Sequence, residues 1–241
     1  MATFHGQTVD VYEDFEDATL ESDLTFSNAS GLGTIPSTTW YHDGANGFAV
    51  DMTTAGGETY HSRLTFSRAS APTTFDRISC GFWYHNCNWT SNGQSMAFMM
   101  LNGGGAAQKL CQVGDVLSWG GVRQFADRAD PAYGQITAPN YSWVWVTVLW
   151  LRNTGYQVNI YDTSHTLLGS WTGLGLGAND YHTTYVDNIV IGLDENWAGF
   201  AGSIGFDEFV IDYTNGVFPL LGWDVTNIID FTEHDHLKLI F

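Results

Sequence analysis

Short apolar runs separated by turn residues are the feature that most restricts how this chain can fold. Runs of strand length recur between clusters of Gly, Asn, Ser and Asp, and no stretch has the apolar spacing of an amphipathic helix. The pattern predicts an all-β protein, a two-sheet antiparallel β-sandwich. The expected strands are Gly47–Met52, Ser62–Ser67, Ile78–Tyr84, Ser95–Leu101, Lys109–Val113, Trp143–Leu151, Tyr156–Tyr161, Leu167–Trp171, Asp187–Gly192 and Phe206–Tyr213.

Two of these strands are apolar at almost every position. "SMAFMML" and "WVWVTVLW" are either buried on both faces, or bury one face and offer the other to a partner. The stretch Gly120–Asn140 reads instead as one long loop. Because the sequence contains no linker and no repeat, we expect one domain over residues 1–222, followed by a separate C-terminal arm over residues 223–241.

The charge balance excludes some classes of partner. The 241 residues include 26 acidic and 8 basic side chains, for a formal net charge of −18. The basic residues are scattered, so we expect no nucleic-acid partner and no binding to anionic membranes. The longest apolar stretch is too short to cross a bilayer, which argues against membrane insertion. The first residues, "MATFHGQTVDVYEDFED", have no basic leader and no apolar run, and therefore predict no signal peptide.

The second half of the chain has a recognisable order of motifs. "YSWVWVTVLWLRNTGYQVNIYDTSHTLLGSW" is followed by "DNIVIG" and then by "GSIGFDEFVIDY". This order resembles the laminin-G-like branch of the concanavalin A-like lectin/glucanase superfamily, whose last strand reads G-x-I-D-E-V-x-I-Y. The resemblance implies a jelly-roll sandwich. It does not imply one function, because the fold includes lectins, glycosidases, lyases, adhesion modules and virion proteins.

The resemblance also implies that a first strand around Thr8–Phe15 lies near the last strand. In the last strand Asp207 has the same parity as Phe209 and Ile211, so simple alternation places Asp207 at the core-side edge. Glu208 has the opposite parity and is expected to face solvent. The two acids are therefore not expected to act as a catalytic pair.

An inward carboxylate needs either amide donors or a cation. The first strand contains "DVYEDFED", and an approach of Asp14 or Glu16 to Asp207 would bring like charges together unless a cation neutralised them. Oxygen ligands of this kind suit Ca²⁺, so one prediction is a structural calcium site at Asp14, Glu16 and Asp207. The alternative is that Asp207 accepts hydrogen bonds from loop amides.

Several aromatic residues fall at strand ends or in loops. Exposed rings beside polar groups can stack on the apolar faces of sugars, and the alternative is that the rings fill the core. The candidate glycan-binding residues are Trp89, Tyr181, His182 and Trp197. The arm ends in alternating Leu237, Leu239 and Phe241, which predict docking on the chain's own sheet or on a neighbouring subunit by strand addition.

Three classes of function remain. Glycosidases of the superfamily carry Glu-x-Asp-x-x-Glu on one strand, and its absence favours a protein that is not an enzyme. The favoured class is a virion surface protein of a tailed phage, a capsid decoration or a tail appendage that could also bind glycans. It would be made in the cytoplasm and released by lysis within a homo-oligomer or a larger assembly. The second is a lectin or carbohydrate-binding module for surface glycans. The third is a polysaccharide-cleaving enzyme.

Overall fold

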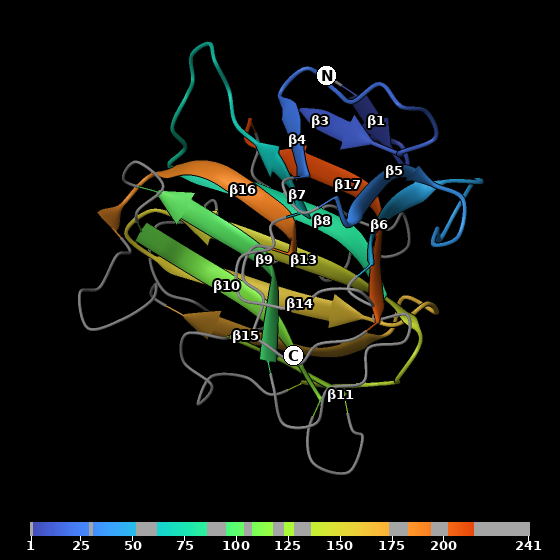
Figure 1. Ribbon diagram of the computed structural model, residues 1–241. Coiled ribbons are helices and arrows are strands. Elements are labelled where there is room, and N and C mark those ends of the chain that lie inside the picture. Colours follow the sequence, from blue (N-terminus) through green and yellow to red (C-terminus); the bar gives the residue numbers. More distant parts are fainter. Residues whose placement is uncertain are drawn as a thin grey trace.

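The protein is a sandwich of two antiparallel β-sheets in a computed structural model (Figure 1). The structure describes residues 2–28, 31–51, 62–85, 95–103, 108–117, 123–127, 136–173, 183–193 and 202–214. Every pairing between described strands is antiparallel. The strands are β1 (Ala2–Phe4), β2 (Gln7–Val9), β3 (Val11–Glu13), β4 (Leu24–Asn28), β5 (Gly33–Ser37), β6 (Gly47–Asp51), β7 (Ser62–Phe66), β8 (Arg77–His85), β9 (Ser95–Gly103), β10 (Gln108–Leu117), β11 (Arg123–Asp127), β12 (Ile136–Ala138), β13 (Trp143–Leu151), β14 (Gly155–Tyr161), β15 (Leu167–Gly173), β16 (Val186–Leu193) and β17 (Ser203–Asp212).

The two sheets confirm the predicted fold class. One sheet has the order β12-β11-β10-β9-β16-β7-β4, and the other has the order β15-β14-β13-β8-β17-β6-β5, with β3 paired to β17 beside it. Each of the ten expected strands corresponds to an observed one. The expectation of a long loop at Gly120–Asn140 was wrong, because β11 and β12 lie within it and extend the first sheet.

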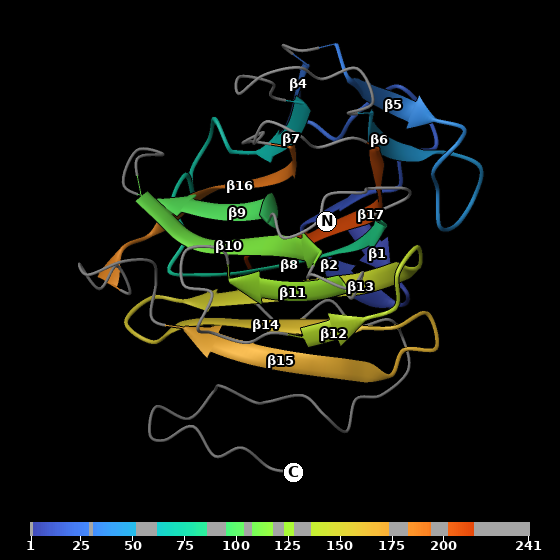
Figure 2. The same cartoon turned by 60° about the horizontal axis from the view of Figure 1, so that its bottom comes forward.

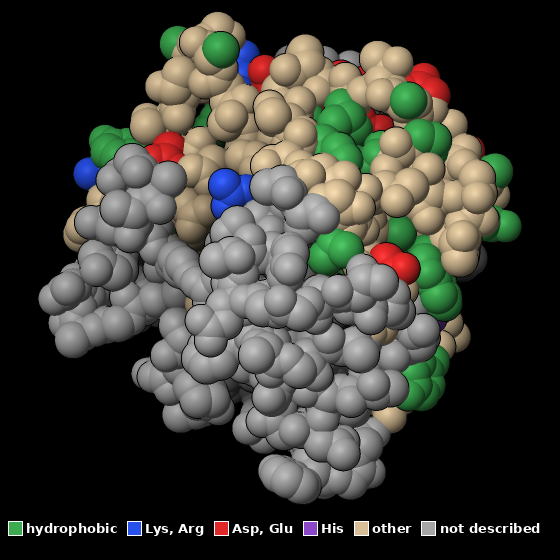
Figure 3. Space-filling model, in the orientation of Figure 1, with side chains coloured by type: hydrophobic (Ala, Val, Ile, Leu, Met, Phe, Trp, Pro, Cys, Tyr) green, Lys and Arg blue, Asp and Glu red, His purple; other side chains and the backbone are tan. Residues whose placement is uncertain are grey.

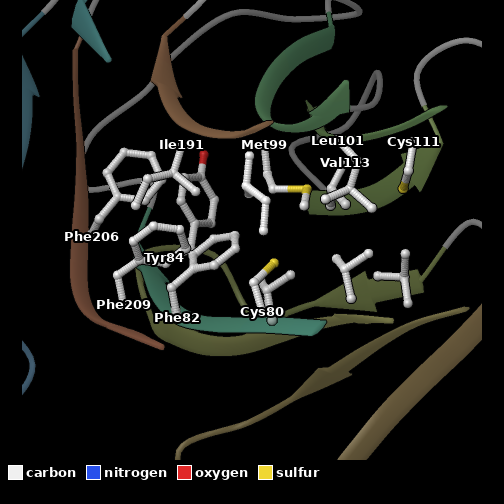
Figure 4. Packing of buried hydrophobic residues seen from close by; sticks show 14 of the residues in the cluster. Cys80, Phe82, Tyr84, Met99, Leu101, Cys111, Val113, Ile191, Phe206 and Phe209 are labelled. Carbon is white, nitrogen blue, oxygen red and sulfur yellow. The ribbon is translucent and has the colours of Figure 1, made fainter. Parts of the chain in front are cut away.

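Aromatic and aliphatic side chains from both sheets fill the space between them (Figure 4). Phe82 and Tyr84 on β8 and Phe206 on β17 meet Met99 and Leu101 on β9, and all five are almost fully buried. The ring centroids of Tyr84 and Phe206 lie 5.5 Å apart. Strand β13 is buried on both faces, as its continuous apolar sequence predicts.

A second, smaller cluster explains why β13 and β8 are also apolar on their outer side. The hairpin β1–β2 places Phe4 and Val9 over Trp83, Trp145 and Val210, outside the sandwich core. The rings of Phe4 and Trp145 stack at 5.4 Å with an interplanar angle of 9°. The N-terminal hairpin therefore covers part of the outer face of the eight-stranded sheet, as the position of β1 and β2 in Figure 2 also shows.

The first and last strands pair, as the resemblance implies. Strand β3 adds to β17 with the register Glu13 to Phe209 and Val11 to Ile211. Within the described part of the chain, no helix is long and apolar enough to cross a membrane. The predicted arm, residues 223–241, lies outside the described residues.

Candidate functional site on the outer face of the eight-stranded sheet

A β-bulge in β17 brings Asp207 and Glu208 to the same face of the sheet. Opposite β8 the register steps from Asp207–Trp83 to Val210–Gly81, so Glu208 and Phe209 together oppose one residue. Glu208 has a positive φ of 49°, in the left-handed region. Asp207 lies beside Trp83 on the outer face, whereas Phe209 belongs to the core.

This bulge overturns two expectations drawn from simple alternation. Asp207 is not on the core side of the strand, because the extra residue shifts the alternation between positions 207 and 209. Glu208 does not face solvent, since it is 6% exposed. It accepts hydrogen bonds from Trp83 Nε1 at 2.9 Å and from Tyr12 Oη at 3.0 Å. The two acids are therefore buried neighbours, and parity no longer separates them.

Asp207 holds the segment between β5 and β6 through hydrogen bonds to its backbone. Its Oδ2 accepts the backbone N–H groups of His42 at 2.7 Å and Asp43 at 2.9 Å, and its Oδ1 accepts the N–H of Glu208 at 2.9 Å. Burial raises the Asp207 pKa to about 7, and the charge of Glu208 adds to the rise, against the lowering effect of the three N–H donors. Burial likewise raises the Glu208 pKa.

Glu16 and Asp14, the two acids from the first strand region, accept backbone N–H groups other than those bound by Asp207. Glu16 Oε1 accepts the N–H groups of Ala45 at 2.9 Å and Asn46 at 3.1 Å, and Asp14 Oδ1 accepts the N–H of Glu16 at 3.1 Å. Glu16 therefore holds the second half of the 40–46 segment, while Asp207 holds the first half. Gly44 between them has a φ of +65° and lies against the Glu16 carboxylate, where a side chain would collide.

These hydrogen bonds correspond to the amide-binding alternative for Asp207. Among the residues that the structure describes, no group of three or more His, Cys, Asp or Glu side chains could hold a metal ion. Calcium at Asp14, Glu16 and Asp207 stays a prediction, and binding there would require these carboxylates to exchange backbone amides for the ion.

Two rings from the 40–46 segment and three from β8 and β13 form an aromatic–histidine cluster. The cluster is defined here as Trp40, His42, Trp83, His85 and Trp143. His42 stacks on Trp83 at 3.7 Å and 15°, and meets the edge of Trp143 at 5.7 Å. His85 contacts Trp143 at 5.1 Å and Trp40 at 5.5 Å. Trp40, His42 and Trp143 are half-buried, so each keeps part of its side chain in solvent.

The histidine at the centre of the cluster is neutral at physiological pH. Burial lowers the His42 pKa to about 4, and the nearby Asp43 opposes this only in part. The Nδ1 atom of His42 is buried and has no hydrogen-bond partner among the described residues. A neutral imidazole has one donor and one acceptor nitrogen, which suits a hydroxyl group.

The opposite sheet has a polar row of its own. On the outer side of the seven-stranded sheet, Asn102 Nδ2 donates to Asn188 Oδ1 at 2.8 Å, and Asn188 Nδ2 donates to Asp187 Oδ1 at 2.7 Å. Asn102 and Gln112 are 7% and 5% exposed. Amide and carboxylate groups of this kind also bind hydroxyls, so this row is a second place where a sugar could lie.

The sequence-based glycan candidates lie outside the described residues. These are Trp89, Tyr181, His182 and Trp197, and the assembly residues Leu237, Leu239 and Phe241 also lie outside them. Sequence reasoning passed over Trp40, His42 and Trp143. The available signal was "TTWYHDG", where two aromatic residues and a histidine precede Asp-Gly in a turn.

Solved structures share this fold with the chain. An endo-β-1,4-glucuronan lyase from the fungus Trichoderma reesei aligns with a TM-score of 0.54 and 16% identity, over 88% of this chain and 99% of the lyase. The cellulose-induced protein Cip1 aligns with a TM-score of 0.54 and 12% identity, over 85% of this chain and 98% of that protein. No family model matches the sequence, and no curated protein matches it.

Proposed function

We infer a carbohydrate-related function, because the chain shares its β-sandwich fold with a glucuronan lyase and a GH43 glycoside hydrolase. We propose that the protein is a carbohydrate-binding β-sandwich of the concanavalin A-like type, and that the aromatic–histidine cluster is its binding surface. The observation that carries the proposal is the contact of partly exposed Trp143 with His42 and His85. Indole faces stack on the apolar faces of sugar rings, and the imidazole of half-buried His42 can pair with a hydroxyl.

Preorganisation of the cluster supports this proposal. Two carboxylates, Asp207 and Glu16, bind four backbone N–H groups of residues 42–46. The backbone amides are thereby used internally, and the side chains of the segment are left to meet a ligand. A site that is already ordered loses less conformational entropy on binding.

The charges around the cluster favour an uncharged glycan. Asp43, Asp207 and Glu208 lie beside it, and His42 is neutral at pH 7. On the face shown in Figure 3, basic side chains are isolated from one another within the described surface. Two described arginines are already paired with acids, Arg68 with Asp23 and Arg152 with Asp76. A uronic acid polymer would bring further negative charge to this surface and would be repelled.

Binding without catalysis is part of the proposal. The two carboxylates beside the cluster already accept hydrogen bonds. Asp207 accepts three backbone N–H groups, and Glu208 accepts from the side chains of Trp83 and Tyr12. Neither has the free, paired arrangement that glycoside hydrolysis needs. The comparisons do not bear on a virion location or on assembly, which stay predictions from the sequence.

The test is binding to neutral polysaccharides by affinity gel electrophoresis and isothermal titration calorimetry. We expect Trp143→Ala to weaken binding by about tenfold, since a well-placed aromatic contact is worth roughly 0.5–1.5 kcal/mol beyond the area that it buries. Trp143→Phe, which keeps a ring, should retain part of the affinity. It also serves as the second variant if the alanine variant does not fold, which circular dichroism would reveal.

A matched control is an exposed aromatic residue that lies beside the far end of β13. Tyr185 is 40% exposed and packs under Arg152, just beyond the end of β13 opposite to Trp143. Since β13 has nine residues, these ends lie about 27 Å apart. Tyr185→Ala should bind glycan normally. Loss of binding in Asn188→Ala together with normal binding in Trp143→Ala would place the site on the other sheet and refute this one.

A further inference from the structure

Strand β15 is an edge strand that lacks charge and proline, two of the features that usually protect an edge. It ends the order of the eight-stranded sheet, and Figures 1 and 2 show it at the border of the sandwich. Its seven residues, "LLGSWTG", include no charged residue and no proline. The other edge strand of this sheet, β5, contains Pro36, and both β5 and β15 have a register shift against their neighbours. Exposed edges without charge or proline tend to pair with another strand.

A buried donor on β15 also has no partner. Trp171 is 5% exposed and belongs to the sandwich core, yet its indole Nε1 has no acceptor among the described residues. Two other indoles share this condition, Trp145 and Trp150, but both lie on the interior strand β13. Buried indole N–H groups usually find an acceptor, so Trp171 indicates a missing neighbour at the edge.

The chain leaves β17 at the end of the sheet where β15 also ends. The registers place Asp212, Ser79, Leu149, Gln157 and Thr172 in one row across five strands. Just beyond this row Thr214 is fixed by Asp10, whose carboxylate accepts its N–H and hydroxyl. Crossing four strand spacings takes roughly 19 Å, which the following twenty or so residues cover easily.

The end of the sequence has the pattern that such an edge requires. Because β15 runs in the same direction as β17, a segment that crosses along the sheet end and turns back would lie antiparallel to β15. In "HLKLIF", Leu237, Leu239 and Phe241 share one face and could extend the core beyond Trp171. Lys238 would then lie on the solvent face of the new edge and protect it.

We propose that residues 236–241 of the same chain add to the free edge of β15 as an antiparallel strand. The added strand completes the sheet, supplies an acceptor for the Trp171 indole and covers its outer flank. This inference stands apart from carbohydrate binding, because it uses neither the aromatic–histidine cluster nor the bulge in β17.

The test compares amide hydrogen exchange in the full chain and in a chain that ends at Asp235. We expect the peptide covering residues 167–173 to exchange at least about tenfold faster in the shortened chain, because its outward N–H groups lose their acceptors. Peptides from the interior strand β13 should not change. Equal exchange of residues 167–173 in both chains would overturn the proposal.

Point variants in the full chain separate docking from a general loss of folding. Leu239→Pro removes one backbone donor and should raise exchange in β15 as the deletion does, whereas Lys238→Ala should leave it slow. Light scattering measures the oligomeric state, and so shows whether the added strand comes from the same chain or from a second copy. The full and shortened chains should have the same oligomeric state. A full chain that is a dimer and a shortened chain that is a monomer would show that the segment docks on a second copy, contrary to this proposal.

Discussion

The buried carboxylate of Asp207 gives the most direct test of how the 40–46 segment is held. Replacing it by alanine removes the acceptor of three backbone N–H groups, those of His42, Asp43 and Glu208. Glu16→Ala is the matched comparison. It removes the acceptor of two N–H groups in the same segment, but its hydrogen bonds are exposed.

Burial sets the difference in magnitude between the two variants. A buried polar group left without a partner costs about 1–3 kcal/mol. The bond to Glu208 N is buried, so that donor bears the full cost. The bonds to His42 and Asp43 are only part-buried, so water can replace some of their loss. We expect Asp207→Ala to lower the free energy of unfolding by about 2–4 kcal/mol, and Glu16→Ala by less than about 1 kcal/mol.

Urea unfolding at pH 6, followed by tryptophan fluorescence, measures both changes. Limited proteolysis of the folded variants reports separately on residues 40–46, which should be cleaved faster in Asp207→Ala. If Glu16→Ala destabilised the protein as much as Asp207→Ala, the reasoning from burial would be refuted. If Asp207→Ala left both stability and cleavage unchanged, the three hydrogen bonds would not hold the segment.

Four further predictions concern the pH dependence of stability, the β1–β2 hairpin, the turn at Gly44 and the binding of Ca²⁺. Because the Asp207 pKa is raised to about 7, the folded state keeps a proton that the unfolded chain loses near pH 4. Asp207 therefore makes the free energy of unfolding fall as pH rises from 4 to 7, whereas the lowered His42 pKa makes it rise. The stability difference between the wild type and Asp207→Ala should accordingly shrink as pH rises from 4 to 7. Phe4→Ala should cost about 3 kcal/mol in urea unfolding, because the ring is 1% exposed over Trp145; a cost near zero would mean that the hairpin does not dock. Gly44→Ala should lower the melting temperature, because φ is +65° and the Glu16 carboxylate fills the space; an unchanged melting temperature would contradict this. Millimolar Ca²⁺ should raise the melting temperature if Asp14, Glu16 and Asp207 bind it, and an unchanged value would end that prediction.

Periodicity predicted the architecture well because the strands of a sandwich carry strong signals. The run Trp143–Leu151 is apolar at alternate and intervening positions, and both its faces are buried. The pairing of the first and last strands followed from motif order. The weak strands β11 and β12 were missed, since "RQFAD" and "ITA" are short and carry little apolar pattern.

The site was harder to predict because one extra residue in β17 determines which side chains face the outer side of the sheet. Alternation holds only while a strand pairs residue for residue, and the bulge at Glu208 breaks the count between Asp207 and Phe209. The sequence at these positions does not predict a bulge, because the bulged residue is a glutamate and glutamate rarely adopts a positive φ. The cluster then depends on a contact between His42 and Trp83, far apart in the chain, which no local pattern contains.

The position of β17 has a consequence for how the protein is made. The last described strand is an interior strand of its sheet, between β8 on one side and β6 and β3 on the other. Ribosomes add residues from the N-terminus, so β3, β6 and β8 emerge long before the strand that joins them. Until residue 212 has left the ribosome, this sheet remains in two separate parts with apolar faces uncovered. Folding of this sheet is therefore expected to wait for β17 to be synthesised and to be slow, as for other sheets joined by distant segments.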